Sequence, residues 1–154
     1  MAASLGNFSL WLSLFFAIFQ FFISRKNNKL KSKFIAIAAN GLLISSLISF
    51  FLLMYSYIVS DFSVLNVFQN SHTTKPLLYK IAAVWGNHEG SMLLWILVLT
   101  IFNFFIFKLY NKKNSDFISK TLETQAFITT GFILFTILTS NPFERMFPVQ
   151  ENGL

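Results

Sequence analysis

Long apolar runs separated by short polar segments make up most of the chain. Four runs, at about residues 5–24, 34–60, 81–107 and 118–140, carry few charged side chains. Each reaches or exceeds the ~20 residues that a helix needs to cross the hydrocarbon core of a bilayer. The pattern therefore predicts an all-α, polytopic membrane protein with four transmembrane helices, forming a single transmembrane region over residues 1–154.

The composition excludes an ordinary soluble domain. Apolar residues make up 55% of the 154 positions, charged residues make up 12%, and 21 residues are phenylalanine. The core of a soluble domain could not hide so much apolar surface from water. The lipid bilayer is thus the first expected partner.

Positive charge is concentrated in two of the three predicted connections, and the net charge is +6. The first connection contains Arg25, Lys26, Lys29, Lys31 and Lys33, the third contains Lys108, Lys112, Lys113 and Lys120, and the second contains only Lys75 and Lys80. Connections rich in Lys and Arg stay on the cytoplasmic or matrix side of a membrane. The charge therefore predicts that the N-terminus lies outside, together with the second connection and the C-terminus, and it does not indicate a nucleic acid partner.

The first apolar run is interpreted as a retained helix rather than a signal peptide. No Lys or Arg precedes the run and the basic cluster follows it, which is the reverse of a secretory signal. The N-terminus also lacks the Arg-rich amphipathic pattern of a mitochondrial presequence, so an organellar copy would be made inside the organelle. Because the chain has no cysteine, it can form no disulfide, thiolate metal site or haem thioether of its own.

Small and hydroxyl-bearing residues predict how the helices pack. Gly41, Ser45 and Ser49 recur every four residues in the second run, a spacing that lets another helix approach closely. In the fourth run, hydroxyls are expected to bond backbone carbonyls or neighbouring helices, and they belong to Thr121, Thr124, Thr129, Thr130, Thr136 and Thr139.

The second connection is too apolar for a bare turn. Its apolar residues are Phe62, Val64, Leu65, Val67 and Phe68. A segment of this kind is expected to lie at the membrane surface. His72, among Ser, Thr and Asn residues, is interpreted as a solvated loop histidine, and Pro76 predicts that the third helix starts after it.

An unusual block, AAVWGNHEGSMLLW at residues 82–95, opens the third run. If the helix already includes Trp85, six side chains share one face at spacings of three and four: Trp85, His88, Glu89, Met92, Trp95 and Ile96. Gly86 and Gly90 lie off that face, four residues apart, and permit close helix contact. Trp85 is interpreted as an interfacial anchor and Trp95 as a core residue.

A His and a Glu side by side at the edge of a bilayer are costly unless protein, water or a ligand satisfies them. Three interpretations are open. Asn87 and Glu89 cap free amides in the first turn of the helix, His88 is an axial ligand of haem or a metal, or the pair relays protons. The cap is favoured because a single imidazole, with no second His or Cys nearby, is a poor metal site.

Three blocks of the chain, DFSVLNVFQNS, KPLLYKIAAVWGNHEGSMLLW and SNPFERMFPVQENG, resemble successive segments of the amino-terminal part of the CcmF family of cytochrome c-type biogenesis proteins. The blocks follow the family's order, and the resemblance covers essentially the whole chain. Its most specific part is the W-G-x-H-E-G-S block followed by L-L-W, which contains Trp85, Gly86, His88, Glu89, Gly90, Ser91 and Trp95.

The resemblance implies a large haem lyase in the inner membrane of bacteria or of some mitochondria. Members of this family take haem from a haem chaperone and join its vinyl groups to the two thiols of a C-x-x-C-H motif in an apocytochrome c. Their haem-handling parts are a tryptophan-rich outer segment, the histidines that flank it, and further histidines that hold a transmembrane b-type haem. Haem is therefore the cofactor expected in the complete protein.

The chain departs from the family pattern because it has no tryptophan-rich segment and its only histidines are His72 and His88. The ligand histidines of the family belong to later segments, so no catalytic, cofactor-binding or metal-binding residue is assigned. We expect an N-terminal fragment or a split-gene product that works with the remaining CcmF segment and other maturation proteins. Alone it should be inactive and haem-free, with the W-G-x-H-E-G-S block organising the fold.

Two other function classes compete with a haem lyase. A structural or assembly subunit of a respiratory or transport complex stays open, because small hydrophobic chains with four helices are common there. An independent channel or transporter is disfavoured, because the helices carry few ionisable residues beyond Glu89 and Glu123.

Overall fold

The computed structural model describes residues 1–25, 31–113 and 116–154, and most of these residues are helical. The helices are α1 (Ala2–Arg25), α2 (Lys31–Ile58), α3 (Leu65–Asn70), α4 (Leu77–Ala83), α5 (His88–Lys113) and α6 (Asp116–Thr139). Within the described ranges there is no strand, only an isolated antiparallel bridge between Val64 and Arg145. Lys26 and Lys29 of the predicted basic connection lie outside the described residues.

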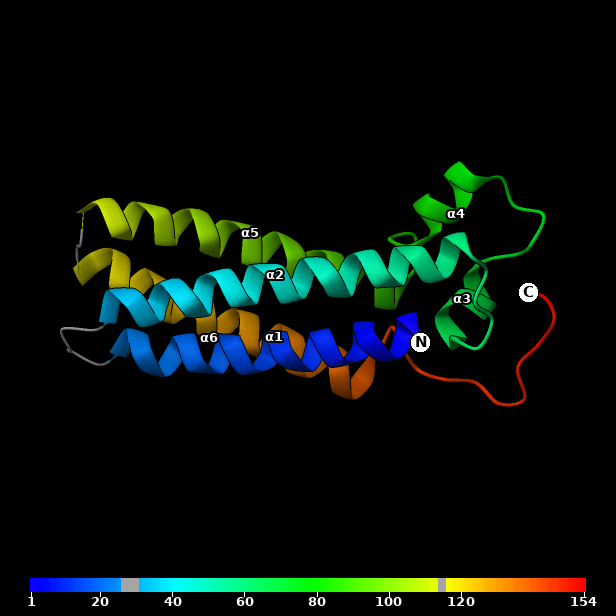
Figure 1. The fold of residues 1–154 in the computed structure, drawn as a ribbon, viewed down its shortest axis with the longest axis horizontal. Helices are drawn as coiled ribbons and strands as arrows, with labels where there is room; N and C mark the ends of the chain where they lie inside the picture. The colour runs from blue at the N-terminus through cyan, green and yellow to red at the C-terminus, as the bar shows by residue number, and fades with distance from the viewer. Residues whose placement is uncertain (26–30, 114–115) are drawn as a thin grey trace.

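Four of these helices, α1, α2, α5 and α6, are long and apolar enough to cross a membrane, which confirms the predicted fold class. They form an elongated bundle (Figure 1) in which α1 packs against α2 and α6, and α5 packs against the same two helices. Helices α1 and α5 therefore occupy opposite corners of the bundle. Both termini, α3 and α4 lie at one end, which we call the capped end.

Close packing of α1 against α2 follows the predicted stripe of small residues. A Cβ added at Gly41 would lie 2.5 Å from the ring of Phe16. The other two stripe residues bond directly to α1, because Ser45 pairs with Ser13 (Oγ to Oγ, 2.8 Å) and Ser49 Oγ donates to the Gly6 carbonyl (3.1 Å). The stripe is thus confirmed as a helix-packing surface.

Polar side chains buried inside the bundle also join its opposite corners. Gln20 on α1 and Asn103 on α5 are fully buried and exchange two amide hydrogen bonds of 2.6 and 2.9 Å. A buried amide is costly without partners, and this reciprocal pair satisfies both side chains. It therefore fixes the register of α1 relative to α5.

The six threonines of α6 behave as their sequence predicts. Each hydroxyl donates to the backbone carbonyl four residues earlier, at distances between 2.7 and 3.1 Å. Because the bond is made within the helix, the threonines need no partner in the membrane.

The second connection forms the cap of the bundle, at the end of the four long helices. Ser60, at a φ of 55°, ends α2 in a left-handed turn, and the Asp61 amide bonds the Ser56 carbonyl at 2.9 Å. The chain then turns back over the bundle, where Val64 and Val67 are fully buried in the main hydrophobic core. Apolar residues of this segment therefore help to close the core at this end of the bundle.

The predicted third helix is two helices with a break between them. α4 starts directly after Pro76, as expected, but it ends at Ala83, and α5 starts at His88. Gly86 and Asn87 occupy the break, and both residue types favour turns over helix interiors. The expected span over residues 81–107 is therefore wrong at its start, and Trp85 belongs to no helix.

Candidate functional site

The break before α5 is held by Asn87, which caps the helix. Its Oδ1 accepts the Gly90 backbone N–H at 2.8 Å, the contact expected of a residue directly preceding a helix. Its Nδ2 donates backward to the Ala83 carbonyl at 2.7 Å, the last residue of α4. One side chain thus joins the end of α4 to the beginning of α5, and the predicted capping role of Asn87 is confirmed.

Gly90 allows this break to close tightly. A Cβ built on Gly90 would lie 1.6 Å from the carbonyl oxygen of Val84, and that oxygen belongs to the backbone. The expected close contact is therefore real, although it is made within the break and not with another helix. Gly86 has no such contact, since its nearest neighbour would lie 3.5 Å from an added Cβ.

A polar cluster, made of Tyr57, Asn66, Asn87 and Glu89, joins the end of α2, the helix α3 and the start of α5. The Tyr57 hydroxyl contacts Asn66 Oδ1 and accepts from Asn87 Nδ2 at 2.9 Å. The Asn66 amide donates to Asn87 Oδ1 at 2.8 Å and to Glu89 Oε2 at 2.9 Å. Tyr57 and Asn66 are buried, so the cluster satisfies groups that would otherwise be costly.

Glu89 has a different partner from the one its sequence position suggests. Instead of capping the first turn of α5, its carboxylate accepts from the Asn66 side chain. Glu89 also lines a polar cavity of about 20 Å³ with Glu144, Gln69 and Asn141, a volume on the scale of a single water molecule. The negative charge still lies in the first turn of α5, where the helix dipole favours it.

His88 has a hydrogen-bond partner outside the polar cluster. It is exposed, and its Nε2 lies 3.0 Å from Ser140 Oγ, just beyond the end of α6. His88 and Glu89 thus have different hydrogen-bond partners, Ser140 and Asn66. Ser91, the next polar residue of the block, donates its hydroxyl to the His88 carbonyl at 2.8 Å.

The two tryptophans of the block are both exposed on this chain. Trp85 is 44% exposed, which agrees with an interfacial anchor, but Trp95 is 58% exposed and so is not the predicted core residue. The shared face drawn from Trp85 to Ile96 is also wrong, because Trp85 precedes α5. Hydrophobicity alone does not separate a core residue from a lipid-facing one when the solvent itself is apolar.

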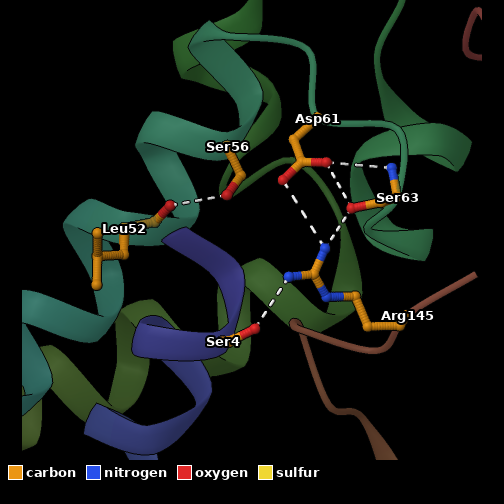
Figure 2. Close-up of polar contacts among 6 residues, drawn as sticks. All are labelled: Ser4, Leu52, Ser56, Asp61, Ser63 and Arg145. Atoms are coloured by element: carbon orange, nitrogen blue, oxygen red, sulfur yellow. Dashed lines mark hydrogen bonds and ion pairs between the residues drawn. The ribbon is translucent and has the colours of Figure 1, made fainter. Parts of the chain in front are cut away.

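Arg145 fastens the segment after α6 to the cap, as Figure 2 shows. Its guanidinium contacts Ser63 Oγ, donates to Ser4 Oγ at 3.1 Å and lies 4.0 Å from the Asp61 carboxylate. Asp61 in turn accepts the backbone N–H of Ser63 at 3.2 Å. Arg145 therefore joins the start of α1, the second connection and the tail (residues 140–154).

His72 lies in a loop, as the sequence predicts, but it is hydrogen-bonded and only partly exposed. Its ring nitrogens lie 2.9 Å from Thr74 Oγ1 and 2.8 Å from Asn152 Nδ2, and the side chain is partly buried. Nearby, the Leu154 amide donates to the Phe68 carbonyl at 2.9 Å. The tail thus lies along the second connection as far as Leu154.

The chain is similar to known proteins along almost its whole length. A family model described as "Cytochrome C assembly protein" matches residues 85–152. The chain is 41% identical to the cytochrome c-type biogenesis protein CycK of Rhizobium meliloti, over 99% of this chain and 23% of that protein. It is 40% identical to CcmF of Haemophilus influenzae, over 96% of this chain and 24% of that protein. The chain belongs to the CcmF family.

The solved structure of "Cytochrome c Heme Lyase CcmF" has the same arrangement of helices. It superposes with a TM-score of 0.83 at 25% identity, over 94% of this chain and 25% of that one. The chain therefore corresponds to the amino-terminal portion of CcmF proteins and spans about a quarter of the length of the relatives it matches. It is a multi-pass membrane protein.

The two histidines of this CcmF-family chain lie apart, with different hydrogen-bond partners. In the described ranges there is no group of three or more His, Cys, Asp or Glu residues that could hold a metal ion. The two histidines are held separately, His88 by Ser140 and His72 by Thr74 and Asn152. We therefore assign neither histidine as a ligand of haem.

The polar cluster was only partly predictable from the sequence. The sequence pointed to Asn87, Glu89 and Gly90 but missed Tyr57 and Asn66, whose contacts complete the polar cluster. One signal was available for Asn66, which stands alone among apolar neighbours in VLNVF. A polar residue inside an apolar stretch that closes a core has to be satisfied by hydrogen bonds.

Proposed function

We propose that the chain is the N-terminal membrane segment of a haem lyase that matures c-type cytochromes. The observation that supports this most strongly is similarity along the whole chain, at 41% identity over 99% of its residues, to a cytochrome c-type biogenesis protein. A structural subunit of a respiratory or transport complex is not favoured, since the relatives with named functions act in cytochrome c biogenesis.

In this proposal the chemistry of haem attachment belongs to the remaining CcmF segment. Both histidines of the chain are hydrogen-bonded within it, and its described residues contain no group of three or more His, Cys, Asp or Glu that could hold a metal ion. The chain contributes a membrane bundle and a rigid cap, while the remaining segment binds haem and meets the haem chaperone and apocytochrome c.

The proposed location is the inner membrane of a bacterium or a mitochondrion, with the capped end on the outer side. The support is the charge pattern, because basic residues cluster in the connections at the end of the bundle opposite the cap. The W-G-x-H-E-G-S block then lies at the outer mouth of α5. Its proposed role is to organise the fold there, through the Asn87 cap and the close approach at Gly90.

Complementation tests this function. In a cell that lacks its own CcmF, the chain and the remaining CcmF segment are produced separately or together, and covalently bound haem on cytochrome c is measured. Only the two together should restore maturation. Restoration by the remaining segment alone would refute a required role for the chain, and stoichiometric haem retained by the purified chain alone would refute the division of labour.

A further inference from the structure

An apolar groove runs along the outer face of α6 and reaches α5. It has a volume of about 590 Å³, and its lining includes Met92, Phe127, Ile128, Gly131 and Phe135. These residues lie within the membrane-crossing parts of α5 and α6. The groove is therefore open to the interior of the bilayer and not to water.

Gly131 makes the floor of this groove. A Cβ added there would meet no atom within 4 Å, whereas the other glycines of the long helices are covered by this chain's own atoms. Phe143 covers Gly6, Phe16 covers Gly41, and the Val84 carbonyl covers Gly90. Gly131 thus resembles a glycine at a helix–helix contact, but no other helix in the described part of this chain packs against it.

The residues on either side of Gly131 shape the groove for another helix. Phe127, Gly131 and Phe135 are spaced four apart, so they form one ridge of α6 with a notch at its centre. Phe127 is 65% exposed and Phe135 is 45% exposed. A ridge of large side chains on a partner helix can enter such a notch, as in the close crossings that glycine permits in membranes.

We infer that this groove is the docking site for a transmembrane helix of the remaining CcmF segment. The inference rests on the proposed function, because the chain spans about a quarter of the length of its relatives, which leaves further chain to be packed in the same membrane. The occupant is an apolar helix that lies against α5 and α6 and places a side chain over Gly131.

Photo-crosslinking tests the docking in membranes that contain the chain and the remaining CcmF segment. A benzophenone amino acid replaces Phe135 in the groove or, in a separate control, Phe51, which is 56% exposed on α2. The probe at position 135 should form an adduct with the remaining segment, and mass spectrometry should map the attachment to an apolar, membrane-spanning peptide. An adduct with lipid only, or with any other protein, would overturn the docking.

Substitutions at Gly131 make the test specific to the groove. Gly131→Leu fills the notch and should lower the adduct at position 135 at least tenfold, while Gly131→Ala should retain most of it. Whatever adduct the probe at position 51 forms should not change. An adduct at position 135 that is indifferent to Gly131→Leu would also overturn the inference.

The yield of haemylated cytochrome c, measured in the same membranes, separates this inference from the proposed function. An adduct without maturation leaves the docking standing and refutes the function. Maturation without the adduct refutes the docking and leaves the function standing.

Discussion

At the scale of single residues, the start of α5 depends on side chains that each make several contacts. Asn87 caps the helix, reaches back to α4 and joins the Tyr57 hydroxyl. Because these bonds belong to one network, removing one member leaves several buried partners unpaired. Residues of the W-G-x-H-E-G-S block should therefore differ sharply in their tolerance of substitution.

Asn87→Ala should lower the stability of the chain clearly. The change removes the cap, worth about 0.5–2 kcal/mol, and leaves buried polar partners at about 1–3 kcal/mol each. Asn87→Ser keeps an oxygen that can cap the helix, so its stability should lie between that of the parent chain and that of Asn87→Ala. The midpoint of thermal unfolding in detergent measures this, with Asn40→Ala as control, since Asn40 is exposed and bonds only within α2. Equal effects at positions 87 and 40 would contradict the helix-capping role of Asn87.

Glu89→Gln should be mild, because the amide keeps an oxygen for the Asn66 donor and loses mainly the charge–dipole energy, about 0.3–1 kcal/mol. Glu89→Leu leaves that donor unpaired and should cost about 1–3 kcal/mol. The yield of haemylated cytochrome c is measured beside the membrane level of the protein. If Glu89→Gln abolishes maturation at a normal protein level, Glu89 has a chemical role and the structural interpretation fails.

Gly90→Ala should destabilise the chain by about 1–3 kcal/mol, because the added Cβ would overlap the Val84 carbonyl and force the backbone to move. The matched control is Gly131→Ala, which meets no atom within 4 Å and should stabilise the isolated chain by up to about 1 kcal/mol through helix propensity. Unfolding of both variants in the same detergent gives the comparison. A Gly90→Ala variant as stable as the parent would disprove the close approach.

At the scale of elements, buried polar contacts decide how the helices pair in an apolar solvent. The Gln20–Asn103 pair joins α1 to α5, Ser13–Ser45 joins α1 to α2, and Ser46–Thr100 joins α2 to α5 at 2.8 Å. In lipid, burial of apolar surface gives helices little reason to associate, so packing and such hydrogen bonds set the arrangement. The helices α1, α2 and α5 are therefore positioned by specific hydrogen bonds as well as by their length.

Gln20→Leu alone and Asn103→Leu alone should each destabilise the bundle, because each leaves the other amide buried without its partner. The double variant should recover part of the loss, with a coupling energy of about 0.6 kcal/mol and at most about 1.7 kcal/mol. A double-mutant cycle of unfolding free energies in detergent measures the coupling. Strictly additive effects would show that the two amides do not interact.

At the scale of the whole molecule, the capped end and the opposite end differ in both structure and charge. The cap contains α3, α4 and the tail, held to the bundle by Arg145 and the polar cluster. At the opposite end, Arg25 pairs with Glu123 at 3.3 Å. The two ends should therefore face different compartments.

Single cysteines in this cysteine-free chain test that orientation. Thr73 is exposed at the capped end, and Asp116 is exposed at the opposite end. An impermeant thiol reagent applied to intact cells should label Thr73→Cys and spare Asp116→Cys until the membrane is permeabilised, because basic connections stay inside. The opposite labelling pattern would reverse the proposed topology.

The sequence by itself determined the elements whose causes are local. The number of membrane helices follows from the lengths of the apolar runs, the threonine bonds of α6 close within one turn, and Asn87 stands directly before the helix it caps. The family was also evident, since the W-G-x-H-E-G-S block is long and unusual in composition.

Only the tertiary structure decided which faces and partners these residues have. Trp95 faces outward, Val64 and Val67 close the core, and Glu89 pairs with Asn66 from another helix. The physical reason is that an apolar side chain has the same local preference in a protein core as in lipid. Its place is settled by neighbours from distant parts of the chain, as are the partners of each buried polar group.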